Sequence, residues 1–288
     1  MKLFALSIAF LTTLLTAVLA TSAAQALPLP KHNLQSVVIP ETFTADYDFE
    51  GIVGLNNCSG SIIQLENAKD ADKALVLTNG HCFEGGFAAP DQFTVNKPSS
   101  RPFNVLNSSG DFIGRVTATT VLYSTMTATD ITLYQLKETY DDIKTKFNVR
   151  PLTLSSKHPE LQMPIEVISG FWKKGYTCGI EKFIDVLKED KWTMKDSIRY
   201  SRPGCETIGG TSGSPIILAG TRQVVGINNT GNEDGEKCTM NNPCEIDAAG
   251  NLTFVKGYSY GQETYWIYSC LNSNQQFDIH AEGCQLPH

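Results

Sequence analysis

The sequence lacks several features that would assign it to common classes of binding protein. No Cys-x-x-Cys pair occurs among its 8 cysteines, which argues against a zinc or dithiol redox site. It has no cluster of Lys or Arg, and 30 acidic against 23 basic residues give a net charge of −7. This balance argues against nucleic acid or an anionic membrane as a partner. No internal repeat at a solenoid period is present, which excludes a repeat architecture.

Long apolar runs are also absent, with one exception at the N-terminus. A largely apolar run over residues 3–20 follows Lys2 and precedes Ala24-Gln25-Ala26. This order predicts a secretory signal peptide over residues 1–26. An uncleaved membrane anchor is the alternative, since the run approaches spanning length. With the signal removed, we expect a secreted protein, extracellular or periplasmic, that makes no membrane contact.

The rest of the chain is typical of an all-β protein. Residues 27–50 contain several prolines and no clear period, and could be a propeptide, an N-terminal arm or a disordered lead-in. From residue 51 onwards, short β-type runs separated by turn signals favour a barrel or sandwich. Residues 140–146 fit a short helix or a charged connection, and they would form a boundary between two barrels. The runs cover residues 51–54, 58–63, 75–77, 93–95, 114–118, 165–170 and 224–227.

The stretch Gly210-Thr211-Ser212-Gly213-Ser214-Pro215 suits an activated nucleophile. A glycine at 210 lets the backbone turn so that its N–H and that of Ser212 converge. Two converging N–H groups can hold the oxyanion that forms when a serine attacks a carbonyl. Alone the motif is weak evidence, because loops are rich in Ser, Gly and Pro.

Two upstream segments supply partners for such a serine. The run Ala74-Leu75-Val76-Leu77-Thr78-Asn79-Gly80-His81-Cys82 ends a strand in a turn that presents His81, placed to act as a general base. The run Asp130-Ile131-Thr132-Leu133 places Asp130 at the head of a strand, where a carboxylate can fix a histidine's tautomer. Each residue also has a simpler interpretation: His81 could be a turn histidine without a function, and Asp130 could cap the turn before its strand.

In order and context, these three motifs resemble those of the trypsin-like (chymotrypsin-fold) serine peptidases. Thr-Asn-Gly-His-Cys is similar to the family's Thr-Ala-Ala-His-Cys, and Asp-Ile-Thr-Leu to its Asp-Ile-Ala-Leu. Gly-Thr-Ser-Gly-Ser-Pro is similar to its Gly-Asp-Ser-Gly-Gly-Pro. The resemblance covers about residues 51–260 and implies His81 as base, Asp130 as its orienting partner and Ser212 as nucleophile. It also implies an oxyanion hole formed by the N–H groups of Gly210 and Ser212.

The resemblance further implies two packed antiparallel β-barrels with the active site in the cleft between them. We expect an N-terminal barrel over 51–145, a C-terminal barrel over 146–265 and a disulfide-closed extension over 266–288. The implied protein is a monomeric endopeptidase that hydrolyses proteins or peptides through an acyl-enzyme and needs no cofactor.

Eight cysteines in an exported chain predict disulfides, although spacing alone cannot choose among about 105 pairings. The resemblance implies Cys58–Cys82, which ties the strand before the base to the residue after it. We expect Cys238–Cys244 to close a small loop and Cys270–Cys284 a C-terminal one. Cys178–Cys205 remains, and would brace the segment that leads to Ser212.

The activation switch of trypsin is not expected here. Ile52-Val53-Gly54 is similar to the new N-terminus of activated trypsin, but it lies only six residues before Cys58. Thr211 replaces the aspartate that would pair with such a terminus. In this departure the chain resembles the bacterial glutamyl-endopeptidase-like branch.

The primary specificity is left open by the sequence. Glu206 lies six residues before Ser212, where trypsin carries its pocket acid, and would favour Lys or Arg; a solvated loop glutamate is the alternative. Thr207 matches a threonine of glutamate-selective members, but Asn228 replaces their histidine. The resemblance implies Asn228, Asn229 and Gly231 as wall residues, because that strand pairs with substrate backbone.

The sequence is also compatible with a calcium site and with two functions other than peptide hydrolysis. The acidic stretch Asn232-Glu233-Asp234-Gly235-Glu236 could bind calcium, but it lacks EF-hand spacing and fits a solvated turn better, so no metal is expected. A catalytically silent binding or adhesion protein could use the same cleft. An esterase could use the same triad, although Ser212 does not lie in a Gly-x-Ser-x-Gly elbow.

Overall fold

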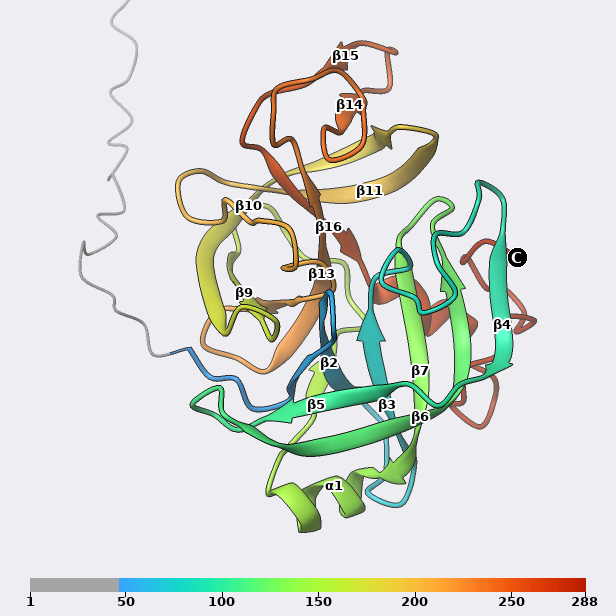
Figure 1. The fold of residues 1–288 in the computed structure, drawn as a ribbon. Coiled ribbons are helices and arrows are strands. Elements are labelled where there is room, and N and C mark those ends of the chain that lie inside the picture. Colours follow the sequence, from blue (N-terminus) through green and yellow to red (C-terminus); the bar gives the residue numbers. More distant parts are fainter. Residues whose placement is uncertain (1–46) are drawn as a thin grey trace, which may run out of the picture. The chain divides into compact units, whose positions relative to one another are not determined.

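The computed structural model describes residues 47–288, which form a nearly all-β protein (Figure 1). The signal peptide expected over 1–26 and most of the possible propeptide or arm at 27–50 lie outside the described residues. Within the described part, no helix combines the length and apolar character needed to cross a membrane.

Six antiparallel strands form a first closed barrel. Hydrogen bonding runs in the order β1-β5-β6-β7-β3-β2, and pairing of β1 with β2 closes the ring. A further strand, β4 (Phe93–Pro98), adds to β6. The barrel strands are β1 (Ile52–Gly54), β2 (Ser59–Gln64), β3 (Lys73–Thr78), β5 (Pro102–Leu106), β6 (Phe112–Thr125) and β7 (Ile131–Thr139).

A second ring of six antiparallel strands closes in the order β13-β12-β9-β10-β11-β16, through pairing of β13 with β16. The short pair β14 (Cys244–Ile246) and β15 (Leu252–Thr253) extends β10. The barrel strands are β9 (Pro164–Ser169), β10 (Lys174–Glu189), β11 (Trp192–Tyr200), β12 (Pro215–Leu218), β13 (Gln223–Gly231) and β16 (Ser259–Glu263). The expected all-β fold of two antiparallel barrels is confirmed.

One helix and one short strand connect the barrels. Helix α1 (Tyr140–Phe147) begins at a capping box, in which Thr139 and Asp142 each bond the other's backbone N–H, and ends at Asn148 in the left-handed conformation. Strand β8 (Leu152–Leu154) then pairs in parallel with β2 and with β13, so it belongs to both barrels. A 3-10 helix, η1 (Tyr265–Cys270), follows β16.

Each barrel has its own apolar core, and a third cluster of buried side chains joins them. The joining cluster contains Ile52 from the first barrel and Ile227 from the second, both fully buried. Ile279 and Leu286 extend it into the C-terminal segment, so that segment packs on the body. Burial of each such side chain contributes about 1.5–3 kcal/mol, which holds the two barrels in a fixed relation.

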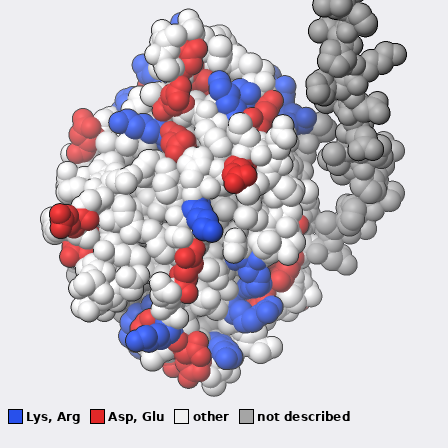
Figure 2. Space-filling model, turned by 180° about the vertical axis from the view of Figure 1, so that it is seen from behind, with Lys and Arg blue, Asp and Glu red and all other residues white. Residues whose placement is uncertain are grey.

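Charges of both signs are mixed on the face of the molecule drawn in Figure 2, where Lys and Arg lie among Asp and Glu. Ion pairs also form near the start of the described chain, where Arg222 contacts Asp48 and Glu50, and Glu50 also pairs with Arg150 at 2.6 Å. These pairs attach residues 47–50 to the second barrel and to the segment after α1.

Candidate active site

His81 and Asp130 meet because β3 and β7 are antiparallel neighbours. Thr78 at the end of β3 pairs with Thr132 at the start of β7, so the turn after β3 lies against the residue before β7. Asp130 Oδ2 lies 2.7 Å from His81 Nδ1, and Asp130 Oδ1 accepts the backbone N–H of His81 at 2.9 Å. Asn79 donates to the Asp130 carbonyl at 2.9 Å, which fixes the position of the aspartate.

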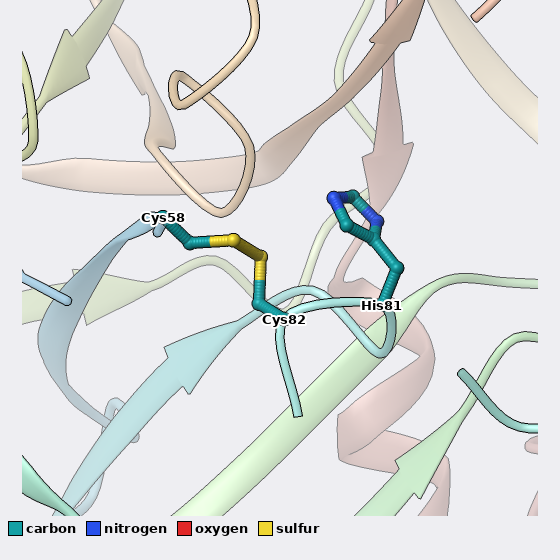
Figure 3. A group of neighbouring side chains, drawn as sticks. All are labelled: Cys58, His81 and Cys82. Carbon is teal, nitrogen blue, oxygen red and sulfur yellow. A yellow bond between two sulfur atoms is a disulfide. The ribbon is translucent and has the colours of Figure 1, made fainter. Parts of the chain in front are cut away.

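The glycine before His81 allows this close approach. A Cβ at Gly80 would lie 1.9 Å from the Thr125 carbonyl oxygen and 2.8 Å from Asp130 Oδ1. Any side chain at this position would therefore displace the carboxylate that holds the imidazole. The Cys58–Cys82 disulfide pins the same turn to the strand β2, and Figure 3 shows this bridge next to His81.

Within residues 210–214 of the loop that carries Ser212, two backbone amides have no partner in the described chain. The N–H groups of Thr211, Gly213 and Ser214 all donate to backbone carbonyls. Those of Gly210 and Ser212 donate to no residue in the range 47–288. Gly210 has φ +88, a conformation that glycine adopts at little cost. The loop therefore offers two amides that could bind an oxyanion.

His81, Asp130 and Ser212 all line one narrow pocket of about 80 Å³. Ser212 is half-buried, and its Oγ donates to the Asn229 carbonyl at 3.3 Å. Within the described residues, no hydrogen bond joins Ser212 to His81. The structure thus brings the three residues to one pocket, with the serine hydroxyl directed at Asn229.

The environment of His81 raises the pKa of its imidazole. Burial alone would lower this pKa, but the charge and hydrogen bond of the Asp130 carboxylate, together with the negative charge of Glu189, outweigh burial. Asp130 is almost fully buried, with a side-chain exposure of 3%, against 20% for His81. A more basic imidazole is a better proton acceptor.

Four of the five predicted specificity residues line this pocket: Thr207, Asn228, Asn229 and Gly231. The Asn228 side chain is buried and accepts a hydrogen bond from Tyr200 at 3.1 Å.

Glu206 is the exception, and its position fits the solvated loop glutamate that is the alternative to a pocket acid. Its side chain is exposed, does not line the pocket, and accepts the Gly204 N–H at 3.0 Å. The turn at Gly204 directs the carboxylate back on its own loop.

Sequence reasoning missed the part of the pocket that comes from the hairpin of β10 and β11. Glu189 ends β10, Trp192 begins β11, and Met194 follows. Trp192 Nε1 donates to the Ala88 carbonyl at 2.8 Å, which docks the hairpin on the first barrel. The turn residues Asp190-Lys191 predict a hairpin, but nothing in the sequence indicates that its tip reaches His81.

Four disulfides are present in the described residues, in the four pairs named above. Cys58, Cys82 and His81 lie close enough to resemble a metal-binding group. Both sulfurs are engaged in the disulfide drawn in Figure 3, so neither is available as a thiolate ligand.

The acidic loop 232–236 is held by amide side chains. Asn232 accepts the Gly235 N–H at 2.8 Å and donates to the Glu236 carbonyl at 3.1 Å. Glu236 accepts a hydrogen bond from Thr239 at 2.8 Å. Between residues 47 and 288, the carboxylates of this loop form no group with converging ligand atoms. The structure gives no support to a calcium site here.

A known protein family matches parts of both barrels. A family model described as "Trypsin-like peptidase domain" matches residues 58–227, more than half of the chain. The closed two-barrel fold is the one that the sequence motifs implied. The chain therefore belongs to the trypsin-like peptidase family.

Solved structures with detectable similarity are distant in sequence. The MamO protease domain from Magnetospirillum magneticum is 13% identical, with 78% of this chain and 97% of that one covered and a TM-score of 0.47. A protease from M. tuberculosis in its active form is 15% identical, with 82% and 81% covered and a TM-score of 0.43. Thermobifida fusca Protease A is 14% identical, with 75% and 90% covered and a TM-score of 0.41. No curated protein matches the chain.

Proposed function

We propose that this protein is a secreted serine endopeptidase that acts through an acyl-enzyme on Ser212. The observation that carries the proposal is the shared pocket of Ser212 with the His81–Asp130 pair, whose ring nitrogen and carboxylate oxygen lie 2.7 Å apart. A binding module has no need of a buried carboxylate that orients a histidine beside a serine.

In the proposed mechanism, His81 acts as general base through Nε2. Asp130 accepts the Nδ1 hydrogen, which fixes the tautomer and leaves the Nε2 lone pair for the serine proton. Rotation of the Ser212 side chain away from the Asn229 carbonyl brings Oγ to His81. Oγ then attacks the substrate carbonyl carbon, and His81 returns the proton to the leaving amine. Water repeats the sequence to release the acyl group.

The N–H groups of Gly210 and Ser212 would bind the oxyanion of each tetrahedral intermediate. Both amides lack an acceptor in the described chain, so they lose no internal hydrogen bond when an oxyanion forms. Loss of one such donor typically costs roughly 100- to 1,000-fold in kcat.

The pocket argues against a preference for acidic side chains. Its lining includes Glu189 and neutral amides, and no Lys or Arg from the described residues. A substrate carboxylate would meet negative charge without a fixed cation. We therefore infer that neutral or basic side chains are preferred. A peptide-library cleavage profile dominated by Glu or Asp before the scissile bond would contradict this inference.

Labelling with a fluorophosphonate probe tests the catalytic assignment. The parent protein should be labelled on Ser212 and should hydrolyse casein. Ser212→Ala should lose both properties while keeping its fold, and Ser214→Ala, two residues away and buried, provides the matched control that keeps labelling. Labelling that survives Ser212→Ala would exclude the assignment. Turnover of esters without any peptide turnover would favour an esterase instead.

Export and the domain division are part of the same proposal. We propose that residues 1–26 are removed on secretion and that 51–145, 146–265 and 266–288 act as the two barrels and an extension. The N-terminal sequence of protein recovered from culture medium tests the first point, since a terminus at Met1 would contradict it.

A further inference from the structure

Three side chains converge on the second barrel outside the catalytic pocket. His158 lies between β8 and β9, Asp196 lies on β11, and Glu263 ends β16. His158 Nε2 is 3.3 Å from Asp196 Oδ2 and 3.5 Å from Glu263 Oε1. One potential ligand atom from each residue lies within 4.8 Å of the other two.

Glu263 is a buried carboxyl group without a hydrogen-bond partner among the described residues, and a bound cation would stabilise its ionised form. Its side chain is fully buried, and neither carboxylate oxygen accepts a hydrogen bond from any residue of the described chain. A buried carboxyl group without such bonds is costly to ionise unless it is paired with a cation or bound to a metal ion. The nearby Asp196 carboxylate adds negative charge, so a cation bound between the two groups would stabilise both in their ionised forms.

The orientation of His158 presents a lone pair to these carboxylates. Its Nδ1 lies 2.6 Å from the Pro159 carbonyl oxygen, which can only accept, so Nδ1 carries the hydrogen. In neutral imidazole the other nitrogen, Nε2, is then an acceptor. Metal-bound histidines usually have this arrangement, with the second ring N–H donated to a carbonyl or carboxylate.

The distances fit a shared metal better than direct hydrogen bonds. A charge-assisted N–H···O contact is about 2.7–2.9 Å long, shorter than the 3.3 and 3.5 Å seen here. Around a tetrahedral zinc ion with bonds of about 2.0–2.2 Å, neighbouring ligand atoms are about 3.3–3.6 Å apart. The two distances from His158 Nε2 to the carboxylate oxygens therefore match edges of such a tetrahedron.

We propose that His158, Asp196 and Glu263 bind one Zn²⁺ ion. The donor set of one imidazole nitrogen and carboxylate oxygens suits zinc, whereas Ca²⁺ takes six to eight oxygen ligands. Tyr265 donates to Asp196 Oδ2 at 3.1 Å and so orients that carboxylate. His158 and Asp196 are partly exposed, which gives the ion a path from solvent and leaves room for a water ligand.

Bound zinc would connect three segments of the second barrel: the loop before β9, strand β11 and the end of β16. An ion that binds the native state and not the unfolded chain raises stability by mass action. The proposed zinc ion therefore stabilises the fold of the second barrel and takes no part in peptide hydrolysis.

Calorimetric titration of metal-free protein with Zn²⁺ tests the proposal. We expect one ion per chain, a higher thermal midpoint with zinc, and visible absorption typical of tetrahedral coordination when Co²⁺ is used. Glu263→Gln preserves shape and removes the buried charge, so it should fold and bind zinc at least about 10-fold more weakly. His158→Asn, at a partly exposed position, should give the same loss.

Matched variants separate this site from others that could bind zinc. Asp185→Asn removes an exposed carboxylate from β10 and should leave the affinity unchanged. His81→Ala removes the catalytic histidine and should also leave it unchanged. The proposal is overturned if His81→Ala abolishes binding, if Glu263→Gln and His158→Asn both bind as tightly as the parent, or if the parent binds no zinc at a 1:1 ratio.

Discussion

The carboxylate of Asp130 holds His81 at two points. One oxygen lies 2.7 Å from the ring nitrogen Nδ1, and the other accepts the backbone N–H of His81 at 2.9 Å. The ring and its backbone are thus fixed by one buried side chain, so the second ring nitrogen, Nε2, is the one available to a proton donor.

Asp130→Asn should abolish most activity without unfolding the protein. The amide has the shape of the carboxylate, but its NH₂ group would face the Nδ1 hydrogen and favour the other tautomer. We expect kcat to fall about 10,000-fold with little change in KM, measured with a fluorogenic peptide. A decrease of less than tenfold would show that Asp130 does not set the tautomer.

Glu189→Gln should shift the acid limb of the pH–rate profile to lower pH. The Glu189 charge helps to raise the pKa of His81, and the base must be neutral to accept a proton. Removing that charge lowers this pKa, so activity persists further into acid. The profile of kcat/KM against pH measures the shift. Asp185→Asn, an exposed acid on the same strand, should leave the limb in place.

Gly80→Ala should disrupt the site as well as the fold. The new Cβ would lie 1.9 Å from the Thr125 carbonyl oxygen, so the turn and Asp130 must both move. We expect a loss of roughly 2–4 kcal/mol in the free energy of unfolding and a loss of activity under native conditions. Gly179→Ala, whose Cβ would meet no atom closer than 3.5 Å, should change neither by much. Equal effects at both glycines would count against this account.

The Cys178–Cys205 disulfide should matter for activity as well as for stability. Replacing both cysteines by serine removes a loop constraint over a sequence separation of 27 residues, worth about 3–4 kcal/mol in the chain-entropy account. Because Cys205 precedes the Ser212 loop, kcat should also fall. The Cys270/Cys284 pair, with a separation of 14, should give a loss of about 3 kcal/mol in denaturant unfolding, with kcat unchanged.

A chain that begins at Ile52 should be less stable than the longer chain and no more active. Ile52 is buried within β1 and pairs with Ser61, and Thr211 is buried where an activated trypsin has its aspartate. Truncation there removes Phe49 from the core and the contacts of Glu50 with Arg150. Thermal midpoints and kcat of the two chains test this prediction. A gain of activity on trimming would indicate a trypsin-like switch after all.

Local patterns in the sequence predicted the fold class because many of the barrel strands are short and have their own turn signals. They missed five barrel strands, β5, β10, β11, β12 and β16, and for the hairpin of β10 and β11 the reason is physical. Strand β10 is long, carries many charged residues and has an irregularity between Ile180 and Lys182 that interrupts the two-residue alternation. Tertiary packing of Trp192 on the first barrel, rather than local propensity, brings this hairpin to the pocket lined by His81 and Ser212.

The sequence by itself determined the family, the two-barrel architecture and the three residues proposed for catalysis, because those features reside in short contiguous motifs around His81, Asp130 and Ser212. Only the tertiary structure decided that Glu206 turns away from the pocket and that Glu189 lines it. It alone brought together His158, Asp196 and Glu263, which are separated by long stretches of chain. Strand pairing and barrel closure bring such distant residues together. Short stretches of sequence do not predict this pairing or closure, because both depend on contacts between segments far apart in the chain.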